Sequence, residues 1–200
     1  MRDLFFSDAN GELNSPLARY WADAQLAGLS VTLLAPLNIN SVQVRKGKAD
    51  ELAKALERHY KLSLVDGAIC AGENDLVFLG TGPGAWLAAW PENLEPPIKQ
   101  LAGQLDGLAS ITDQSSGYKL LRVSGETSKS LLARGLAVNL EAPNFKTSNV
   151  VVSSIAHIGV VIWQTDDQPT FIIAVASSYC ESFCHWLSGA IKGVIQDQKE

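Results

Sequence analysis

The stretch SITDQSSGYKLLRVSGETSKSLLARGL, residues 110–136, decides the predicted fold of this chain. It begins with a polar turn cluster at 113–117. The next six residues, 118–123, alternate between two faces, as the side chains of a half-buried strand do. Gly125 then precedes a run whose leucines fall on or near one stripe of a helix. The stretch therefore predicts the order turn, strand, glycine, helix.

The same order of strand, glycine and helix is predicted at two places, 42–60 and 119–136. A hairpin followed by a helix that contains tryptophan is also predicted twice, at 69–90 and at 158–187. Repeats on this scale are too long for a solenoid and indicate an internal duplication. The predicted fold class is α+β, with two βαβββα-type halves fused about a shared sheet and helices on one side.

The predicted domain organisation is an N-terminal arm followed by one duplicated domain. Residues 1–40 precede the first repeat and form the arm, and residues 41–200 form a single α+β domain. The halves of that domain are 41–97 and 98–200. We expect them to stay together because each half has too few elements to cover its own sheet.

The arm carries an unusual number of aromatic residues: Phe5, Phe6, Tyr20 and Trp21. They either fold back onto their own domain or dock onto a partner, where aromatic side chains are typical anchors. On the docking interpretation, deletion of residues 1–14 together with Trp21→Ala leaves the unfolding midpoint nearly unchanged. It weakens assembly with the partner instead.

Two of the helices are assigned from local signals alone. Residues 85–90 follow a glycine-rich break and are stopped by Pro91, so they are expected to form a short helix. The last helix is expected at 178–195, where Ser178 and Glu181 have the spacing of a capping box.

Composition and charge exclude several classes of function. The chain has 200 residues, of which 46% are hydrophobic and 18% charged, and its formal net charge is −5. Nucleic acids and anionic membranes require a basic surface, which this balance does not supply. No apolar run is long enough to cross a bilayer, and the N-terminus does not resemble a secretory signal. We expect a soluble cytoplasmic protein that binds neither nucleic acid nor membrane.

The three cysteines are odd in number, which fits a reducing compartment. Cys180 and Cys184 lie four residues apart on the last predicted helix, a spacing that suits a disulfide poorly. A zinc site requires four converging ligands, and the three histidines show no ligand spacing with the cysteines. We interpret the pair as small apolar residues on a buried helix face, without metal or disulfide.

The glycine-rich run Gly80–Gly84 follows a predicted strand and invites comparison with a phosphate-binding loop. It lacks the Gly-Lys-Ser/Thr ending of such loops, and Pro83 removes a backbone donor where the phosphate would bind. The dinucleotide fingerprint also fails, because no βαβ unit is evident. We interpret this run as shaping a loop.

A second polar cluster contains Asp113, Ser115 and Ser116, which could serve catalysis with a distant histidine. A nucleophilic serine needs a positioned base and usually a sharp elbow. Aspartate and serine just before a strand more simply accept hydrogen bonds from backbone amides in turns. His157 is expected to be a hydrogen-bonded histidine in an apolar strand, and Asp166 and Asp167 to be solvated in a hairpin turn. No catalytic, cofactor-binding or metal-binding residue is predicted.

Several short motifs occur in an order and spacing that resemble one family. They are Ser15-Pro16-Leu17-Ala18, Leu79-Gly80 through Gly82-Pro83 to Trp86-Leu87, Asp113 to Gly117, Leu121 to Gly125, Leu131 to Gly135, Val138-Asn139-Leu140 and Phe145. Together they resemble the gamma subunit of heterotetrameric sarcosine oxidase, within the aminomethyltransferase-like superfamily. The resemblance implies the fold of the N-terminal folate-binding domain of aminomethyltransferases.

The resemblance also implies a function within a larger assembly. Such an assembly oxidatively demethylates sarcosine to glycine and transfers the one-carbon unit to tetrahydrofolate. FAD, FMN, NAD and tetrahydrofolate are expected on partner subunits, which are the alpha, beta and small delta chains. The gamma chain would be a structural, non-catalytic subunit that holds no cofactor.

The alternative is a free-standing folate-dependent aminomethyltransferase or folate-binding protein. The wider relatives carry a carboxylate in the hairpin of the second half that works with the folate amine. At the corresponding positions this chain has Ile162 and Trp163. An apolar pair cannot bind a pterin amine or transfer a proton, so the structural subunit is the favoured hypothesis.

Overall fold

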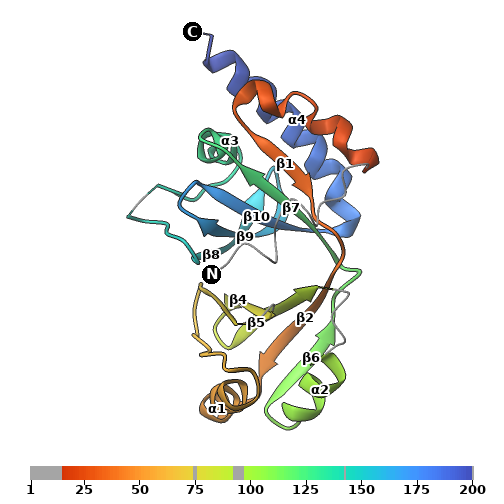
Figure 1. Ribbon diagram of the computed structural model, residues 1–200, viewed down its shortest axis with the longest axis vertical. Helices are drawn as coiled ribbons and strands as arrows, with labels where there is room; N and C mark the ends of the chain where they lie inside the picture. Colours follow the sequence, from red (N-terminus) through yellow and green to blue (C-terminus); the bar gives the residue numbers. More distant parts are fainter. Residues whose placement is uncertain (1–14, 74–75, 92–96, 142, 200) are drawn as a thin grey trace. The chain divides into compact units, whose positions relative to one another are not determined.

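Ten strands in the described part of the chain form two antiparallel sheets of five strands each (Figure 1). The structure is a computed structural model that describes residues 15–73, 76–91, 97–141 and 143–199. Among these, residues 36–115 form a first unit, and residues 15–35 and 116–199 form a second. The shared sheet expected from the sequence is therefore wrong, since each unit has a sheet of its own.

The first unit has the strand order β3-β4-β5-β2-β6. Its strands are β2 (Leu37–Val44), β3 (Cys70–Glu73), β4 (Leu76–Gly82), β5 (Ala85–Pro91) and β6 (Ala109–Asp113), and its helices are α1 (Ala49–Tyr60) and α2 (Pro97–Gln104). The expected helix after Gly47 is confirmed as α1, which buries Leu52 and Leu56 at a four-residue step. The helix ends at Tyr60, and its C-cap residue Lys61 has a left-handed φ of 55° and donates its amide to carbonyls of the last turn.

The second unit has the strand order β1-β7-β10-β9-β8. Its strands are β1 (Ser30–Leu33), β7 (Tyr118–Ser124), β8 (Val150–Ile155), β9 (Ile158–Asp166) and β10 (Thr170–Ala176). Its helical elements are the 3-10 helices η2 (Pro16–Trp21), η3 (Ala24–Ala27) and η4 (Ser177–Tyr179), and the α-helices α3 (Ser128–Ala133) and α4 (Cys180–Asp197). The strand expected at 118–123 is confirmed as β7, which pairs with both β1 and β10.

The two sheets correspond strand by strand, which confirms the predicted duplication. β3, β4, β5, β2 and β6 of the first occupy the positions of β8, β9, β10, β7 and β1 in the second. From β2 and from β7 onward, each half of the chain runs βαβββα. In the chain, β1 precedes β2 and β6 precedes β7, yet β1 pairs with β7 and β6 pairs with β2. Thus β1, which precedes the first half in the chain, joins the sheet of the second half, and β6, which precedes the second half, joins the sheet of the first.

This exchange places the unit boundaries elsewhere than the sequence prediction did. The chain passes between units at 35/36 and at 115/116, not after residue 40 and after residue 97. The physical reason is that β1 and β6 each belong to the sheet of the strand with which they form hydrogen bonds, β7 and β2 respectively. Each partner strand lies far away in the sequence.

Residues 15–35 form an integral part of the second unit. The N-cap expected at Ser15 is confirmed, since its Oγ accepts a hydrogen bond from the Leu17 amide at 3.3 Å. Trp21 is buried in the hydrophobic core, and β1 adds an edge to the sheet beside β7. The burial of Trp21 favours the interpretation that it folds back onto its own chain, so Trp21→Ala is now expected to lower the unfolding midpoint. Phe5 and Phe6 lie outside the described residues.

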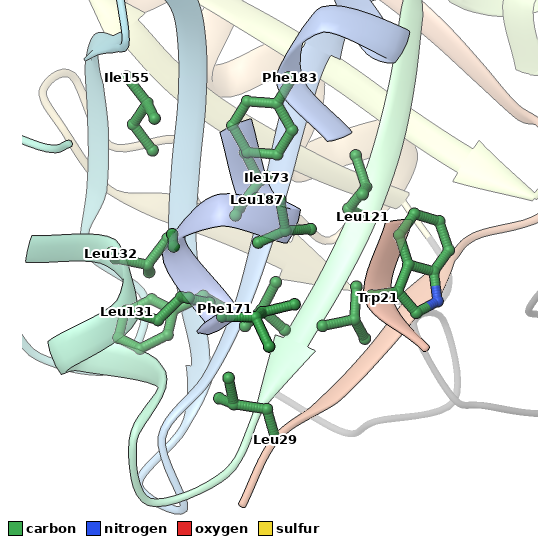
Figure 2. Packing of buried hydrophobic residues seen from close by; sticks show 14 of the residues in the cluster. Trp21, Leu29, Leu121, Leu131, Leu132, Ile155, Phe171, Ile173, Phe183 and Leu187 are labelled. Carbon is green, nitrogen blue, oxygen red and sulfur yellow. The ribbon is translucent and has the colours of Figure 1, made fainter. Parts of the chain in front are cut away.

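Figure 2 shows the core of the second unit, in which residues from distant segments meet. Leu121 of β7, Phe171 of β10 and Phe183 of α4 are each fully buried there. Leu131 and Leu132 of α3 lie in the same cluster. One face of the sheet is thus covered by α3, α4 and the N-terminal 3-10 helices, and its apolar side chains are removed from water.

One predicted helix is a strand. Residues Ala85–Pro91 form β5, which is hydrogen-bonded to β2 on one side and to β4 on the other. Five consecutive side chains of β5, from Trp86 to Trp90, are buried. A strand buried on both faces shows no alternation of polar and apolar residues, so its sequence does not reveal a period of two. The sequence prediction also missed α2 and β6.

The start of the last helix differs from the expected capping box. α4 begins at Cys180 after the short 3-10 helix η4, and its N-cap residue Tyr179 makes no side-chain capping bond. Glu181 accepts hydrogen bonds from the Arg19 guanidinium and the Tyr20 hydroxyl, each at 2.9 Å. The carboxylate therefore ties η2 to α4 at the surface and does not close a helix cap.

Candidate functional site

The polar cluster 113–117 lies where the chain passes from the first unit to the second. Asp113 and Ser115 belong to the first unit, where the Ile39 amide donates to Ser115 Oγ at 3.0 Å. In the second unit, Ser177 donates from its Oγ to the carbonyl of Ser116 at 2.8 Å. The cluster is thus bound to β2 at one end and to the first residue of η4 at the other.

The Asp113 carboxylate is part of this turn. Its Oδ1 accepts the Ser115 hydroxyl at 2.7 Å and the Ser115 amide at 2.8 Å. The side-chain bond from Ser115, with the backbone bond added, lowers the pKa of Asp113 below its ordinary value. Because the serine Oγ both donates to this carboxylate and accepts the Ile39 amide, its geometry fits the predicted backbone-satisfying role.

The glycine-rich run 80–84 closes the hairpin between β4 and β5. A Cβ at Gly80 would lie 1.7 Å from the carbonyl oxygen of Gly67, so only glycine allows this close approach. Gly84 has a φ of 64° and donates its amide to Asp66 Oδ1 at 2.9 Å. The Gly84 amide, which a phosphate would need as a donor, is thus already hydrogen-bonded to a carboxylate. The run is also followed by a strand and not by the helix of a phosphate-binding loop.

Cys180 and Cys184 lie in the first turns of α4 and are buried free thiols. A hydrogen bond between the two thiols lowers the pKa of Cys180 and raises the pKa of Cys184. His185 is exposed and faces the ring of Tyr20 edge-on at 6.1 Å. Within the described ranges, no group of three or more His, Cys, Asp or Glu residues could hold a metal ion.

The hairpin turns differ from expectation in detail. His157 is an exposed residue of the turn between β8 and β9, so its predicted place inside an apolar strand is wrong. Asp166 Oδ1 accepts the amides of Gln168 and Thr170 at 2.9 and 3.1 Å, and Asp167 accepts the Thr147 hydroxyl at 2.6 Å. Asp166 therefore organises the turn between β9 and β10, and Asp167 joins this turn to the segment before β8, which goes beyond the solvated role assigned from sequence.

Ile162 and Trp163 occupy the middle of β9, where wider relatives are expected to carry a carboxylate. Both side chains are fully buried, and they point to opposite faces of the sheet because they are adjacent in a strand. Ile162 belongs to the core cluster beneath α4. Neither residue presents a group that could accept a hydrogen bond from a pterin amine.

The candidate groups serve separate structural tasks and do not converge. The serine–aspartate pair forms a turn at the end of the first unit, the glycine run shapes a hairpin, and the cysteines lie in the core. None of the helices in the described part of the chain is long and apolar enough to cross a membrane.

The residue that sequence reasoning missed is Val152 of β8, whose exposed apolar side chain stands on a sheet edge.

The fold is of the type found in aminomethyltransferases. A structure of the glycine cleavage system aminomethyltransferase T from Bartonella henselae superposes with a TM-score of 0.61 at 13% identity, covering 90% of this chain and 51% of that one. A chain of heterotetrameric sarcosine oxidase from Corynebacterium sp. U-96, in complex with pyrrole 2-carboxylate, superposes with a TM-score of 0.77 at 22% identity. That superposition covers 91% of this chain and 96% of the other.

The chain belongs to the sarcosine oxidase gamma subunit family, whose model matches residues 46–192. Sarcosine oxidase subunit gamma of Corynebacterium sp. strain P-1 is 26% identical over 125 residues, which cover 62% of this chain. The subunit gamma of strain U-96 is 26% identical over 147 residues, covering 72% of this chain and 70% of the relative. The match spans 61% of the length of the strain P-1 relative.

Proposed function

We propose that this chain is the structural, non-catalytic gamma subunit of a cytoplasmic, heterotetrameric sarcosine oxidase. The observation that carries the proposal is the family match over residues 46–192, which includes elements of both units. The superposition on a chain of a heterotetrameric sarcosine oxidase, which covers nearly all of both chains, supports it. Within the assembly, the chain would brace the larger subunits.

The assembly would oxidatively demethylate sarcosine to glycine and pass the one-carbon unit to tetrahydrofolate. Its FAD, FMN, NAD and tetrahydrofolate would be held by the partner subunits, which are alpha, beta and the small delta chain. This part of the proposal follows from the family resemblance. The chain described above contributes surfaces to the assembly and not reacting groups.

Two features of this chain support the placement of cofactors on other subunits. A nucleotide phosphate would need free amides in the run 80–84, but the Gly84 amide already donates to the Asp66 carboxylate. A pterin would need a carboxylate near the middle of β9, where Ile162 and Trp163 are buried. The residues present do not fit either group.

The test is co-expression of the chain with the flavoprotein subunits encoded in neighbouring open reading frames. We expect one complex with equal amounts of each chain, with the flavin retained by the larger subunits after the gamma chain is removed. A gamma chain that elutes alone, while the flavoprotein subunits form an active oxidase without it, would contradict the proposal.

The transferase alternative predicts a different binding measurement. Calorimetry of the purified chain with tetrahydrofolate is expected to give no one-to-one isotherm in the micromolar range, and flavin is likewise expected not to bind tightly. A micromolar isotherm with tetrahydrofolate would contradict the structural role and favour a folate-dependent enzyme.

A further inference from the structure

We propose that the outer edge of β8 (Val150–Ile155) pairs with an extended, uncharged strand from a partner subunit of the assembly. This inference rests on the proposed function, which supplies the partner subunits. It assigns one surface of the second unit to an interface. The partner strand recognises that surface through backbone hydrogen bonds in β conformation.

The hairpin turn between β8 and β9 determines which backbone groups of β8 face outward. Its two turn residues, Ala156 and His157, have φ values of 49° and 67°, as in a two-residue turn of type I′. The flanking residues Ile155 and Ile158 are then a hydrogen-bonded pair, and hydrogen-bonded and non-bonded pairs alternate along the ladder. Val152 pairs with Val161 three steps further on, so its N–H and C=O point away from β9.

Nothing in the described part of the chain pairs with the backbone of Val152 on that outer side. An isolated bridge between Leu136 and Ile155 covers one end of the edge. The Val152 side chain is 53% exposed, which is high for a valine in a strand. An outward donor, an outward acceptor and an exposed β-branched side chain therefore stand together at the middle of this edge.

The other three sheet edges are shorter than β8. β1 and β3 each have four residues, and β6 has five and ends in Asp113. β8 has six residues, VVVSSI, with no charged residue, proline or glycine. Proteins normally protect an exposed edge with charges, prolines or bulges, because an unprotected edge pairs with other chains. Since β8 carries none of these devices, its sequence suits an edge that is paired in the assembled state.

The chemistry of the edge specifies its occupant. A strand of six residues spans about 20 Å, so a segment of similar length in extended conformation matches it. The occupant is uncharged and rich in β-branched or small residues, because a buried charge beside Val150 and Val152 would lack a partner on β8. A partner subunit is the source, since the proposed assembly contains a single gamma chain.

The variant Val152→Pro tests the proposal directly. Proline removes the N–H that points outward and leaves every hydrogen bond to β9 in place, and prolines are tolerated at strand edges. Val152→Thr is the matched control, because it keeps the N–H and the branched shape. In co-expression with the flavoprotein subunits, we expect Val152→Pro to reduce co-purification of the chain about tenfold and Val152→Thr to leave it unchanged.

Hydrogen exchange of the wild-type protein provides a second measurement that does not depend on a variant. We expect the Val152 amide to exchange slowly in the assembled complex and rapidly in the full-length chain alone. Equal exchange in the two states, or unchanged co-purification of Val152→Pro, would overturn the proposal. Equal protection in the chain alone would identify a second copy or the chain itself as the occupant. If wild-type chain fails to co-purify with the flavoprotein subunits, the proposed function and this inference both fail.

Discussion

The two units share a strand order but differ in the helices that cover their sheets. α1 has 12 residues, whereas α3, at the corresponding place in the second unit, has six. α2 has eight residues, whereas its counterpart α4 has 18. The second unit adds η2 and η3, which pack against α4. The duplicated sheets have thus been retained while the helical layer has diverged.

This difference indicates that strand pairing tolerates less change than helix packing. Each strand of a sheet is held by the register of its neighbours, and a shift of one residue would turn its buried face outward. A helix can lengthen or shorten at its ends as long as its apolar stripe still covers the sheet. Substitutions in corresponding helices of the two units therefore test whether each helix contributes equally to the free energy of unfolding.

The largest effect is expected in α4. Phe183→Ala should lower the free energy of unfolding by about 4 kcal/mol, because it removes a fully buried ring from the core. Leu52→Ala in α1 of the first unit should cost about 3 kcal/mol, since a smaller side chain leaves a smaller cavity. Denaturant titration measures both, with exposed His185→Ala as a control expected within about 0.5 kcal/mol of wild type. A loss below about 1 kcal/mol for Phe183→Ala would argue against α4 as the main cover.

Trp21 tests whether residues 15–35 belong to the second unit. Trp21→Ala should destabilise the chain by about 3 kcal/mol, because its ring is buried in the cluster with Leu121 and Phe183. The matched control is Leu26→Ala in the neighbouring 3-10 helix, whose side chain is 70% exposed and whose loss should be small. Thermal unfolding distinguishes the two. An unchanged midpoint for Trp21→Ala would restore the arm interpretation.

The glycine run of the first unit should show a smaller, position-dependent effect. Gly80→Ala should cost about 2 kcal/mol, because its Cβ would collide with the Gly67 carbonyl and the loop must move. Gly82→Ala, two residues further on, meets open space and should change stability by less than about 0.5 kcal/mol. Equal losses for the two variants would mean that flexibility, and not close approach, explains the run.

The smallest effect is expected at the crossing between the units. Ser115→Ala removes the hydroxyl that bonds Asp113 and the Ile39 amide and should cost about 1 kcal/mol near neutral pH. Because the pKa of Asp113 lies below its ordinary value of 3.8, its ionised form stabilises the fold above that pH. The contribution is lost as the pH falls through the folded value.

NMR titration of the Asp113 carboxyl group measures this coupling. In Ser115→Ala, its pKa should move up toward the ordinary value, because the largest cause of the lowering is gone. The exposed Ser116→Ala is the control, since its side chain does not bond the carboxylate. A pKa that stays low in Ser115→Ala would assign the lowering to another source.

Much of the local structure could be predicted from sequence. Alternation in residues 118–123 identified β7, and the leucines at a four-residue step identified α1. The antiparallel pairs β3–β4 and β9–β10 were indicated by polar segments between apolar runs. The repeated order of strand, glycine and helix indicated the duplication. These signals are readable because each depends on residues close together in the chain.

The sequence also limited the chemistry of the candidate groups. In the sequence, Pro83 in the glycine run argues against phosphate binding, and the apolar pair Ile162–Trp163 argues against folate binding. The structure supplied the partners that the sequence could not name, such as Asp66 for the Gly84 amide and Ile39 for Ser115. Those partners are distant in sequence, so no local pattern could reveal them.

Only the tertiary structure decided which strands belong together. Residues 85–90 form a strand because β2 and β4 bind them on both sides, although their sequence shows no alternation. β1 pairs with β7 and not with β2, which follows it in the chain, β6 pairs with β2 and not with β7, and β8 is left at an edge. Sequence determines local conformation through spacing and side-chain shape. Sheet membership is determined by hydrogen bonds between segments far apart in the chain, which local preferences do not encode.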